Sequence, residues 1–318
     1  MDKKLLSKRI KDFALEIGFD ACGIAKVEDL SKERSILNQW LAKQYHGDMA
    51  YMARNIEKRT NPSELIGGAQ SVISVLLNYY PAKNLHKNSF YKISKYALSA
   101  DYHYVIKEKL KPIIELLEEV KPGVNIRAFT DSAPVLDKSW AQRAGLGWMG
   151  KNSLLINKNL GSFFFIGEII VDIDLVADSA FEQEYCGTCT KCIDACPTDA
   201  LHKPYEMDAN KCISYLTIET KKEIPEDIIP KLNNWVYGCD ICQDVCPWNS
   251  KAKPSTEPYF KISDELSIMQ KQDWEDLDKP KFKKLFKNSA LQRGGFKKLK
   301  SVINDIHNSK CSTDESVN

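Results

Sequence analysis

Ten cysteines are the clearest chemical signal in the 318-residue chain, because eight of them fall between residues 186 and 246. Thiolates are soft ligands for metals, and disulfides are rare in compartments that keep thiols reduced. The N-terminus has charged residues every few positions, no apolar segment of a secretory signal and no twin-arginine pair. We therefore expect a cytoplasmic protein whose clustered cysteines bind metal rather than form disulfides.

The spacing of these cysteines points to iron–sulfur clusters. The two runs are Cys186-x-x-Cys189-x-x-Cys192-x-x-x-Cys196-Pro197 and Cys239-x-x-Cys242-x-x-x-Cys246-Pro247. The first run has the bacterial ferredoxin pattern for a [4Fe–4S] cluster, in which the fourth cysteine ligates the other cluster of a pair. Gaps of two residues wrap a tight loop around a cubane, whereas the longer gap and the proline turn the chain toward the neighbouring cluster.

Cys212 stands alone between the runs and replaces the cysteine that the second run lacks. The predicted ligand sets are Cys186, Cys189, Cys192 and Cys246 for one cluster, and Cys196, Cys212, Cys239 and Cys242 for the other. Eight thiolates for two clusters leave none over. Zinc is the alternative metal, but a Cys₄ zinc site does not require two runs that each end in Cys-x-x-x-Cys-Pro. Cys22 and Cys311 are expected to be a buried and a tail thiol without a role.

The rest of the chain must supply a folded body that positions these thiols. Hydrophobic residues make up 43% and charged residues 28% of the sequence, which excludes a disordered or fibrous chain. No uncharged apolar stretch reaches about 18 residues, so no membrane span is expected. The net charge of +2 excludes a strongly basic protein on average but permits a local basic patch. At about 100–200 residues per domain, the length suggests two or three units.

Apolar periodicity predicts helices and strands mixed through residues 1–175. Helices are expected at residues 3–17, 101–120 and 136–144, with helical or turn-like segments at 36–51 and 62–69. Strands are expected at residues 21–25, 71–79, 125–130, 153–157 and 162–172. We therefore predict an α/β or α+β domain over residues 1–175, a ferredoxin-like module with two [4Fe–4S] clusters over residues 176–250, and a polar, basic helical tail over residues 251–318 whose last eight residues are disordered.

The tail contains a basic segment, residues 279–300, with nine Lys or Arg and no Asp or Glu. Interleaved apolar residues predict one or two amphipathic helices there. Two interpretations stay open at this point. The charges could form an ordinary solvated face, or they could follow the phosphates of a nucleic acid.

Further segments resemble the epoxyqueuosine reductases, a family of cytoplasmic tRNA-modifying enzymes related in fold to reductive dehalogenases. The resemblance covers about residues 1–250. Its segments are Tyr51-Met52 with Lys58-Arg59 and Pro62; Asp101-Tyr102-His103; Asp131-Ser132-Ala133-Pro134; Arg143 to Trp148; Gly150-Lys151-Asn152; Gly161-Ser162 with Gly167-Glu168; Cys212 to Glu219; and Tyr237 to Asn249. The resemblance implies an enzyme that reduces the epoxide of epoxyqueuosine, at the wobble position of tRNA, to queuosine.

The resemblance also implies cobalamin beside one of the two clusters and a proton donor at Asp131. Asp131 follows the predicted strand 125–130. A pKa raised through desolvation by the cobalamin ring would let it donate a proton near neutral pH. The alternative role for Asp131 is a cap for the helix that follows Pro134. The electrons must come from an external donor, and the enzyme is expected to act as a monomer.

The family's cofactor and tRNA contacts can be carried onto matching positions. Cobalamin contacts are expected at Arg54, Asn152, Leu155, Ile166, Ser214 and Asp240, with residues 94–96 as further candidates. Leu155 and Ile166 could instead be core strand residues. Lys221 and Lys222 are placed like tRNA contacts, although they could be an ordinary exposed lysine pair.

The sequence departs from related patterns in two places. Asp101-x-His103 begins like the DxHxxG motif that supplies a histidine to cobalt, but Ile106 stands where the glycine should be. We therefore expect His103 to be structural and cobalt to have no protein histidine ligand. Several family members continue into a helical-repeat domain, and the stretch from Ser289 to Arg293 resembles its beginning.

Two other functions compete with this interpretation. A reductive dehalogenase would use the same cofactors on a small organohalide, but such enzymes usually carry an export signal and would not need the basic segment. A pure electron carrier would not need 175 residues of α/β domain before its clusters.

Overall fold

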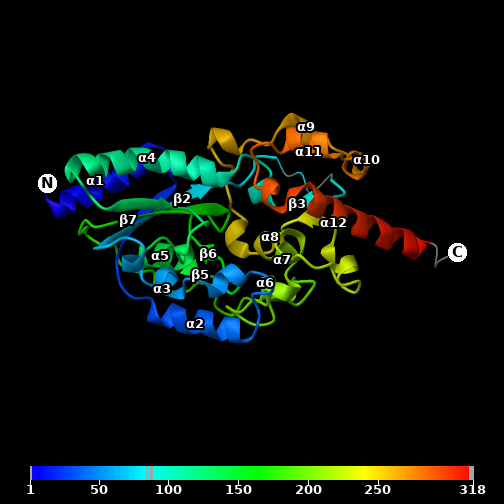
Figure 1. The fold of residues 1–318 in the computed structure, drawn as a ribbon, viewed down its shortest axis with the longest axis horizontal. Helices are drawn as coiled ribbons and strands as arrows, with labels where there is room; N and C mark the ends of the chain where they lie inside the picture. The colour runs from blue at the N-terminus through cyan, green and yellow to red at the C-terminus, as the bar shows by residue number, and fades with distance from the viewer. Residues whose placement is uncertain (1, 84, 86–88, 315–318) are drawn as a thin grey trace.

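The computed structural model describes residues 2–83, 85 and 89–314, and its centre is an antiparallel sheet in the order β1-β2-β7-β4 (Figure 1). The strands are β1 (Ala21–Lys26), β2 (Ser71–Asn78), β4 (Ile126–Phe129) and β7 (Phe164–Val171). All four overlap the strands expected from the sequence. Mixed helix and strand content is therefore confirmed, and the antiparallel pairing makes this part of the fold α+β.

Helices cover both faces of the sheet (Figure 1). One face is covered by α1 (Lys3–Glu16) and α4 (Tyr102–Val120), and the other by α5 (Asp137–Arg143), with α2 (Ser31–Ala42) and α3 (Ile56–Thr60) beyond it. Every residue of β2 is consequently buried. A strand covered on both faces needs apolar residues on both, which explains why most residues of β2 are apolar.

The iron–sulfur module is built from short helices attached to the cysteine runs. It contains α6 (Lys191–Asp194), α7 (Ile213–Ile218) and α8 (Ile241–Asp244). Helices α6 and α8 pack against each other, and each carries one cysteine of its run. Strand β8 (Trp235–Tyr237) pairs in parallel with β3 (Lys92–Ile93), which ties the module to the first half of the chain. A small hairpin of β5 (Trp148–Met149) and β6 (Leu155–Ile156) lies beside α5.

The C-terminal segment is more firmly packed than its polar composition predicted. It folds into α9 (Asp264–Ser267), α10 (Lys271–Glu275), α11 (Lys279–Leu285) and α12 (Leu291–Asp314). Trp274, Phe282 and Phe286 are buried in the same apolar cluster as the inner face of α4. The expected disorder is wrong for residues 311–314, which are helical, and residues 315–318 lie outside the described residues. The domain limits at residues 175 and 250 stay a prediction.

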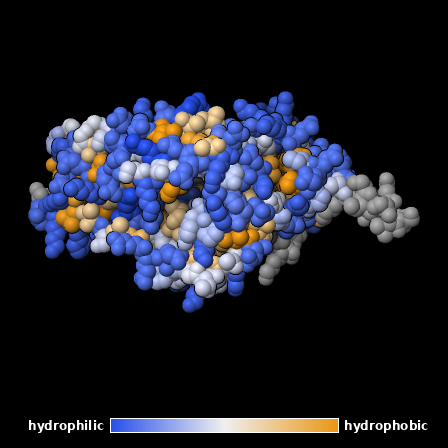
Figure 2. Space-filling view, turned by 90° about the horizontal axis from the view of Figure 1, so that it is seen from below, coloured by the Kyte–Doolittle hydropathy of each residue, from blue (hydrophilic) through white to orange (hydrophobic). Residues whose placement is uncertain are grey.

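The surface of the molecule is mostly hydrophilic on the face seen in Figure 2, where the hydrophobic residues form small, separate patches. Among the residues described, no helix is both long and apolar enough to cross a membrane. The apolar side chains are instead collected in the core on the two sides of the sheet.

The sheet also buries one ionisable side chain, Glu168 on β7, which has no exposed surface. The Ser74 hydroxyl donates a hydrogen bond to Glu168 Oε2 at 2.8 Å, whereas Oε1 has no partner. Burial raises the pKa of Glu168 well above its ordinary value. The protonated acid is therefore the stable form inside the sheet.

This burial predicts how the free energy of unfolding depends on pH. The folded-state pKa of Glu168 exceeds its unfolded-state value, so the folded protein keeps a proton that the unfolded chain releases. Glu168 should therefore make the unfolding free energy fall as the pH rises above the unfolded pKa, by up to about 1.4 kcal/mol per pH unit. Glu168→Gln removes this titration. Urea unfolding at several pH values should therefore show that the unfolding free energy of the variant rises relative to that of the wild type as the pH increases.

Glu118→Gln provides the matched control, because Glu118 is an exposed carboxylate on α4. Its difference from the wild type should not change with pH. A pH-independent difference for Glu168→Gln as well would show that Glu168 is not protonated in the folded protein.

Candidate functional site

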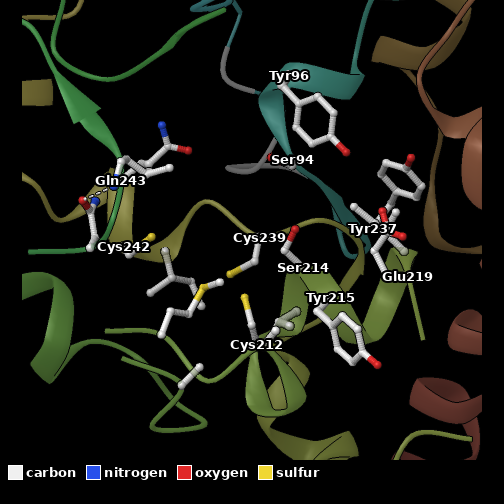
Figure 3. A pocket seen from close by; sticks show the side chains of 18 of the residues that line it. Ser94, Tyr96, Cys212, Ser214, Tyr215, Glu219, Tyr237, Cys239, Cys242 and Gln243 are labelled. Carbon is white, nitrogen blue, oxygen red and sulfur yellow. Dashed lines mark hydrogen bonds between the residues drawn. The ribbon is translucent and has the colours of Figure 1, made fainter. Parts of the chain in front are cut away.

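A cavity of about 500 Å³ lies at the end of the sheet where β2 and β4 end and β7 begins. The iron–sulfur module and the C-terminal segment complete its walls. Its lining includes Tyr102 and His103 from the start of α4, Asp131 from the loop after β4, Ser214 and Glu219 from α7 and its end, and Arg293 from α12. Part of this lining is shown in Figure 3. Segments that are far apart in the sequence therefore meet at one cavity.

The structure brings each predicted set of four thiols to a cavity of its own. Cys196, Cys212, Cys239 and Cys242 line the large cavity, and Figure 3 shows the sulfurs of Cys212 and Cys239 pointing toward each other. Cys186, Cys189, Cys192 and Cys246 line a neighbouring cavity of about 220 Å³. The Lys151 ammonium donates a hydrogen bond to the backbone oxygen of Cys189 at 3.1 Å, so it holds the loop of the first run.

The chemistry of these thiols suits a metal cluster. Burial raises the pKa of Cys212 and Cys242, so the thiolates need a nearby positive charge to form. Iron supplies that charge and prefers sulfur ligands. Each set of four thiols lines a cavity.

Asn152 provides an unsatisfied donor between the two cavities. It lines both cavities and is only 5% exposed. Its Oδ1 accepts a hydrogen bond from the Leu154 backbone amide at 3.3 Å, but its Nδ2 has no partner. A buried donor without an acceptor costs about 1–3 kcal/mol. A bound group that offers an acceptor would remove this cost, which fits the cofactor contact predicted for Asn152.

Of the other predicted cofactor contacts, some line the large cavity, whereas the side chain of Asp240 is buried. Ser214 lines the large cavity, as do Ser94 and Tyr96. The Asp240 side chain is fully buried, and its carboxylate accepts hydrogen bonds from the Ser94 hydroxyl and from the backbone amide of Lys95. A cofactor contact from Asp240 could therefore come only from its backbone.

Two of the predicted contacts are apolar residues of the core. Leu155 and Ile166 pack with the apolar cluster on the α5 side of the sheet, whereas Leu154 and Phe164 line the large cavity. A cofactor contact from Leu155 or Ile166 stays a prediction.

The charged candidates lie outside the lining of the cavity. Arg54 is exposed and is not among the lining residues. Lys221 and Lys222 are also exposed, and they follow Glu219, which does line the cavity. The Lys222 ammonium lies 3.7 Å from the Asp48 carboxylate. These three side chains are therefore accessible to a large partner at the surface.

Asp131 lies in a network of hydrogen-bonding side chains. The Tyr102 hydroxyl donates to Asp131 Oδ2 at 2.5 Å, and His103 Nε2 lies 3.6 Å from the same oxygen. His103 Nδ1 lies 2.7 Å from Asp101 Oδ1. Helix α5 begins at Asp137 with Leu136 as its cap residue, so the alternative role of Asp131 as a helix cap is wrong.

The charges in this network shift the pKa values of Asp131 and His103. The nearby His103 ring lowers the pKa of Asp131, and the hydrogen bond from Tyr102 acts in the same direction, although burial opposes them. The rise expected from desolvation by the cobalamin ring stays a prediction. Burial opposes the charge of His103, but the hydrogen bond to Asp101 and the nearby Asp131 carboxylate raise the pKa of His103 to about 9. His103 is therefore protonated at neutral pH and lines the large cavity. Its expected structural role, which leaves cobalt without a histidine ligand, stays a prediction.

Two further side chains at Asp131 were missed by sequence reasoning. Arg293 Nη1 lies 4.0 Å from Asp131 Oδ2. Burial, followed by the charge of Asp131, raises the pKa of Asp137 to about 7. The sequence marks the Ser289 to Arg293 stretch only as a possible domain start, and no sequence signal links either residue to Asp131.

Comparisons with known proteins agree with this site. A family model described as "4Fe-4S double cluster binding domain" matches residues 185–249, and one described as "Epoxyqueuosine reductase QueG, DUF1730" matches residues 59–132. An epoxyqueuosine reductase of Leadbetterella byssophila is 54% identical over 93% of this chain and 97% of its own length.

Two solved structures are similar over 95% of this chain and 80% of theirs, each with a TM-score of 0.83. One is an epoxyqueuosine reductase with an epoxyqueuosine-modified tRNA stem loop, at 28% identity. The other is an epoxyqueuosine reductase from Bacillus subtilis, at 27% identity, whose catalytic loop is swung out of the active site.

The two thiol sets predict that the clusters can be damaged separately. Anaerobically reconstituted protein should hold about eight irons per chain, and Cys212→Ala should lose about half of them because only one set is incomplete. Iron analysis and electron paramagnetic resonance measure both effects.

Cys22→Ala provides the control, because Cys22 lies on β1 and its burial raises its pKa to about 12. It should retain all of the iron. Stoichiometric zinc, or full iron in Cys212→Ala, would contradict the proposed ligand sets.

Proposed function

The chain belongs to the epoxyqueuosine reductase family, and from this membership we propose that it reduces epoxyqueuosine in tRNA to queuosine with Asp131 as proton donor. The observation that carries the proposal is the large cavity, where Asp131 and four cluster-type thiols share one lining. Reduction of an epoxide needs electrons and protons at the same carbon–oxygen bond. A cavity lined by cluster ligands on one part of its wall and by a carboxylate on another can supply both.

The residues that would hold the cofactors follow from the two cavities. The chain binds two [4Fe–4S] clusters, and we assign them to the two thiol sets. Cobalamin, implied by the family resemblance, fits the large cavity, where the unpartnered Asn152 Nδ2 could donate to an amide side chain of the corrin. Both ring nitrogens of His103 face carboxylates, which supports a cobalt without a histidine ligand. When bound, these groups supply the electrons that an external donor provides.

The proton balance assigns roles to two side chains. Converting the epoxide to an alkene and water consumes two electrons and two protons. Asp131 gives one proton to the oxygen as its bond to carbon breaks, and this leaves a carboxylate. His103, protonated at neutral pH, holds the second proton 3.6 Å from that carboxylate. The pKa of Asp131 is lowered in a cavity that is open to water, where 52% of its side chain is exposed. Cofactor and substrate would desolvate it and shift its pKa upward.

The competing functions fit the site less well. An electron carrier needs no cavity with a hydrogen-bonded Asp, His and Tyr beside its clusters. A reductive dehalogenase would act on a small organohalide and would not need tRNA. Anaerobic assays with tRNA bearing epoxyqueuosine, queuosine or neither separate all three functions.

The role of Asp131 predicts a selective loss of turnover in Asp131→Asn. Asparagine keeps the shape and can still accept a hydrogen bond from Tyr102, but it cannot donate the proton. The variant should keep both clusters, cobalamin binding and tRNA affinity, and should lose turnover by roughly 10²–10⁴-fold. Single-turnover assays on epoxyqueuosine-bearing tRNA measure the loss.

Asp12→Asn makes the same chemical change at an exposed carboxylate on α1 and should retain full turnover. Near-normal turnover of Asp131→Asn would reject the catalytic role. Loss of cobalamin binding together with turnover would instead indicate that Asp131 is a cofactor contact.

The basic segment 279–300 has fewer free charges than its sequence suggested. Lys281 lies 3.6 Å from Asp273, and Lys284 lies 3.5 Å from Glu265. Lys283, Lys287 and Lys297 are exposed, so they are the better candidates for contacts with tRNA phosphates. Together with Lys221, Lys222 and Arg54, they supply positive charge at the surface for a polyanionic substrate.

These exposed lysines predict a change in the salt dependence of tRNA binding. Replacing Lys283, Lys287 and Lys297 with Gln should weaken binding and reduce the slope of log affinity against log salt by roughly 0.7–0.9 for each phosphate that the variant no longer neutralises. Fluorescence anisotropy with a labelled anticodon stem loop measures the slope.

The exposed cations Lys4, Lys8 and Arg9 on α1 allow a charge-matched triple Gln control. It should leave the slope unchanged. If the tail variant also has an unchanged slope, the segment is a solvated face and not a tRNA contact.

A further inference from the structure

Arg293 comes from the last helix of the chain, yet its side chain lines the cavity that contains Asp131. Its Nη2 forms an ion pair with Glu219 Oε1 at 2.7 Å, and its Nη1 lies 4.0 Å from Asp131 Oδ2. The Tyr51 side chain lines the same cavity. One guanidinium thus joins the C-terminal segment to the end of α7 and to the loop after β4.

The fold fixes the short turn that carries Arg293. The Ser289 hydroxyl donates to the backbone oxygen of Ala97 at 3.0 Å, and the Tyr237 hydroxyl donates to that of Ala290 at 2.7 Å. A Cβ atom on Gly294 would approach the Tyr237 ring to 3.0 Å, so glycine permits this close packing. The first turn of α12 is therefore anchored to the wall of the cavity.

Gly295 then separates this turn from the rest of α12. Its φ of 72° and ψ of 167° break the helix immediately after the anchored turn. A residue with a side chain rarely adopts this conformation. The break lets the turn point Arg293 into the cavity while the remainder of the helix packs elsewhere.

The charge of Arg293 acts directly on Asp131. A guanidinium stays protonated at any physiological pH, so its effect does not titrate away. Together with the larger effects of His103 and Tyr102, it lowers the pKa of Asp131. Both side chains are about half exposed, at 48% and 52%, so water screens this interaction until a ligand fills the cavity.

Asp131 itself needs support to hold its position. Its φ of 51° lies in the left-handed region, which is unfavourable for a residue other than glycine. Its carboxylate is approached by Tyr102, His103 and Arg293. Arg293 is the contact among these that comes from the C-terminal segment.

We propose that Arg293 is a positioning residue, which keeps the Asp131 carboxyl turned into the cavity and stabilises the carboxylate that remains after proton donation. The inference rests on the proposed function of Asp131. The proton moves from Asp131 to the epoxide oxygen as the carbon–oxygen bond breaks, and Arg293 exchanges no proton or electron. Proton donation in the large cavity thereby depends on the anchored turn of the C-terminal segment.

The proposal is tested by the pH dependence of turnover in Arg293→Gln and Arg293→Lys. Turnover should fall with rising pH as Asp131 loses its proton. Removing a neighbouring cation raises the pKa of an acid, so Arg293→Gln should move the midpoint of this fall to higher pH. Weaker positioning should also lower kcat about ten- to hundredfold. Arg293→Lys keeps the charge and should leave the midpoint near that of the wild type.

The other groups around Asp131 that carry or can acquire a charge must stay unchanged for this comparison. They are Tyr51, Tyr96, Tyr102, His103, Asp137, Lys138 and Glu219. Arg9→Gln removes the same charge from the surface of α1 and should change neither kcat nor the midpoint.

Three results would overturn the proposal. The first is an unchanged midpoint and kcat in Arg293→Gln. The second is a higher KM for tRNA with an unchanged midpoint and an unchanged kcat, which would assign Arg293 to tRNA binding. The third is a lower kcat with an unchanged midpoint in both variants, which would indicate a structural role only. Wild-type activity on the modified stem loop is measured in parallel, so that failure of the proposed function itself is seen separately.

Discussion

The large cavity depends on bringing thiols from separate segments next to a carboxylate from another part of the chain. Helix α7 is central to this convergence, because Cys212 is its N-cap residue and Glu219 is its C-cap residue. Its six residues span only about 9 Å. The helix therefore presents a proposed cluster ligand at one end and the ion-pair partner of Arg293 at the other, and both line the same cavity. A shift of α7 would disturb electron supply and the surroundings of Asp131 together.

Local sequence patterns were sufficient for the parts of the structure that depend on short-range spacing. The strands followed from runs of β-branched residues, and the grouping of the thiols followed from the gaps within each cysteine run. The residues that face the cavity could not be identified in the same way. Phe164 and Ile166 are two residues apart on β7 and pack with the same apolar cluster, yet only Phe164 lines the large cavity. The difference depends on where the end of the sheet meets the cysteine-bearing segments, and spacing within one strand does not show that.

The electrostatics of Asp131 could not be predicted from its own segment. The expected rise of its pKa depended on desolvation by the cobalamin ring. Among the protein's own groups the pKa is instead lowered, because α4 places His103 and Tyr102 beside the carboxylate, while Arg293 approaches from the C-terminal segment. A broken metal-ligand motif made His103 look structural. Yet the same histidine, once it is held between Asp101 and Asp131, becomes a cation at neutral pH.

The basic segment shows why composition alone does not assign a role to a charged residue. Its nine positive charges look equivalent in sequence, but the fold separates them. Phe282 and Phe286 bury one side of α11, which leaves Lys283 and Lys287 facing solvent. The break at Gly295 turns Arg293 toward the cavity, whereas Lys297 lies beyond the break and is exposed. One segment thus contributes apolar side chains to the core, a guanidinium to the cavity and ammonium groups to the surface, and only the tertiary structure determines which residue does which.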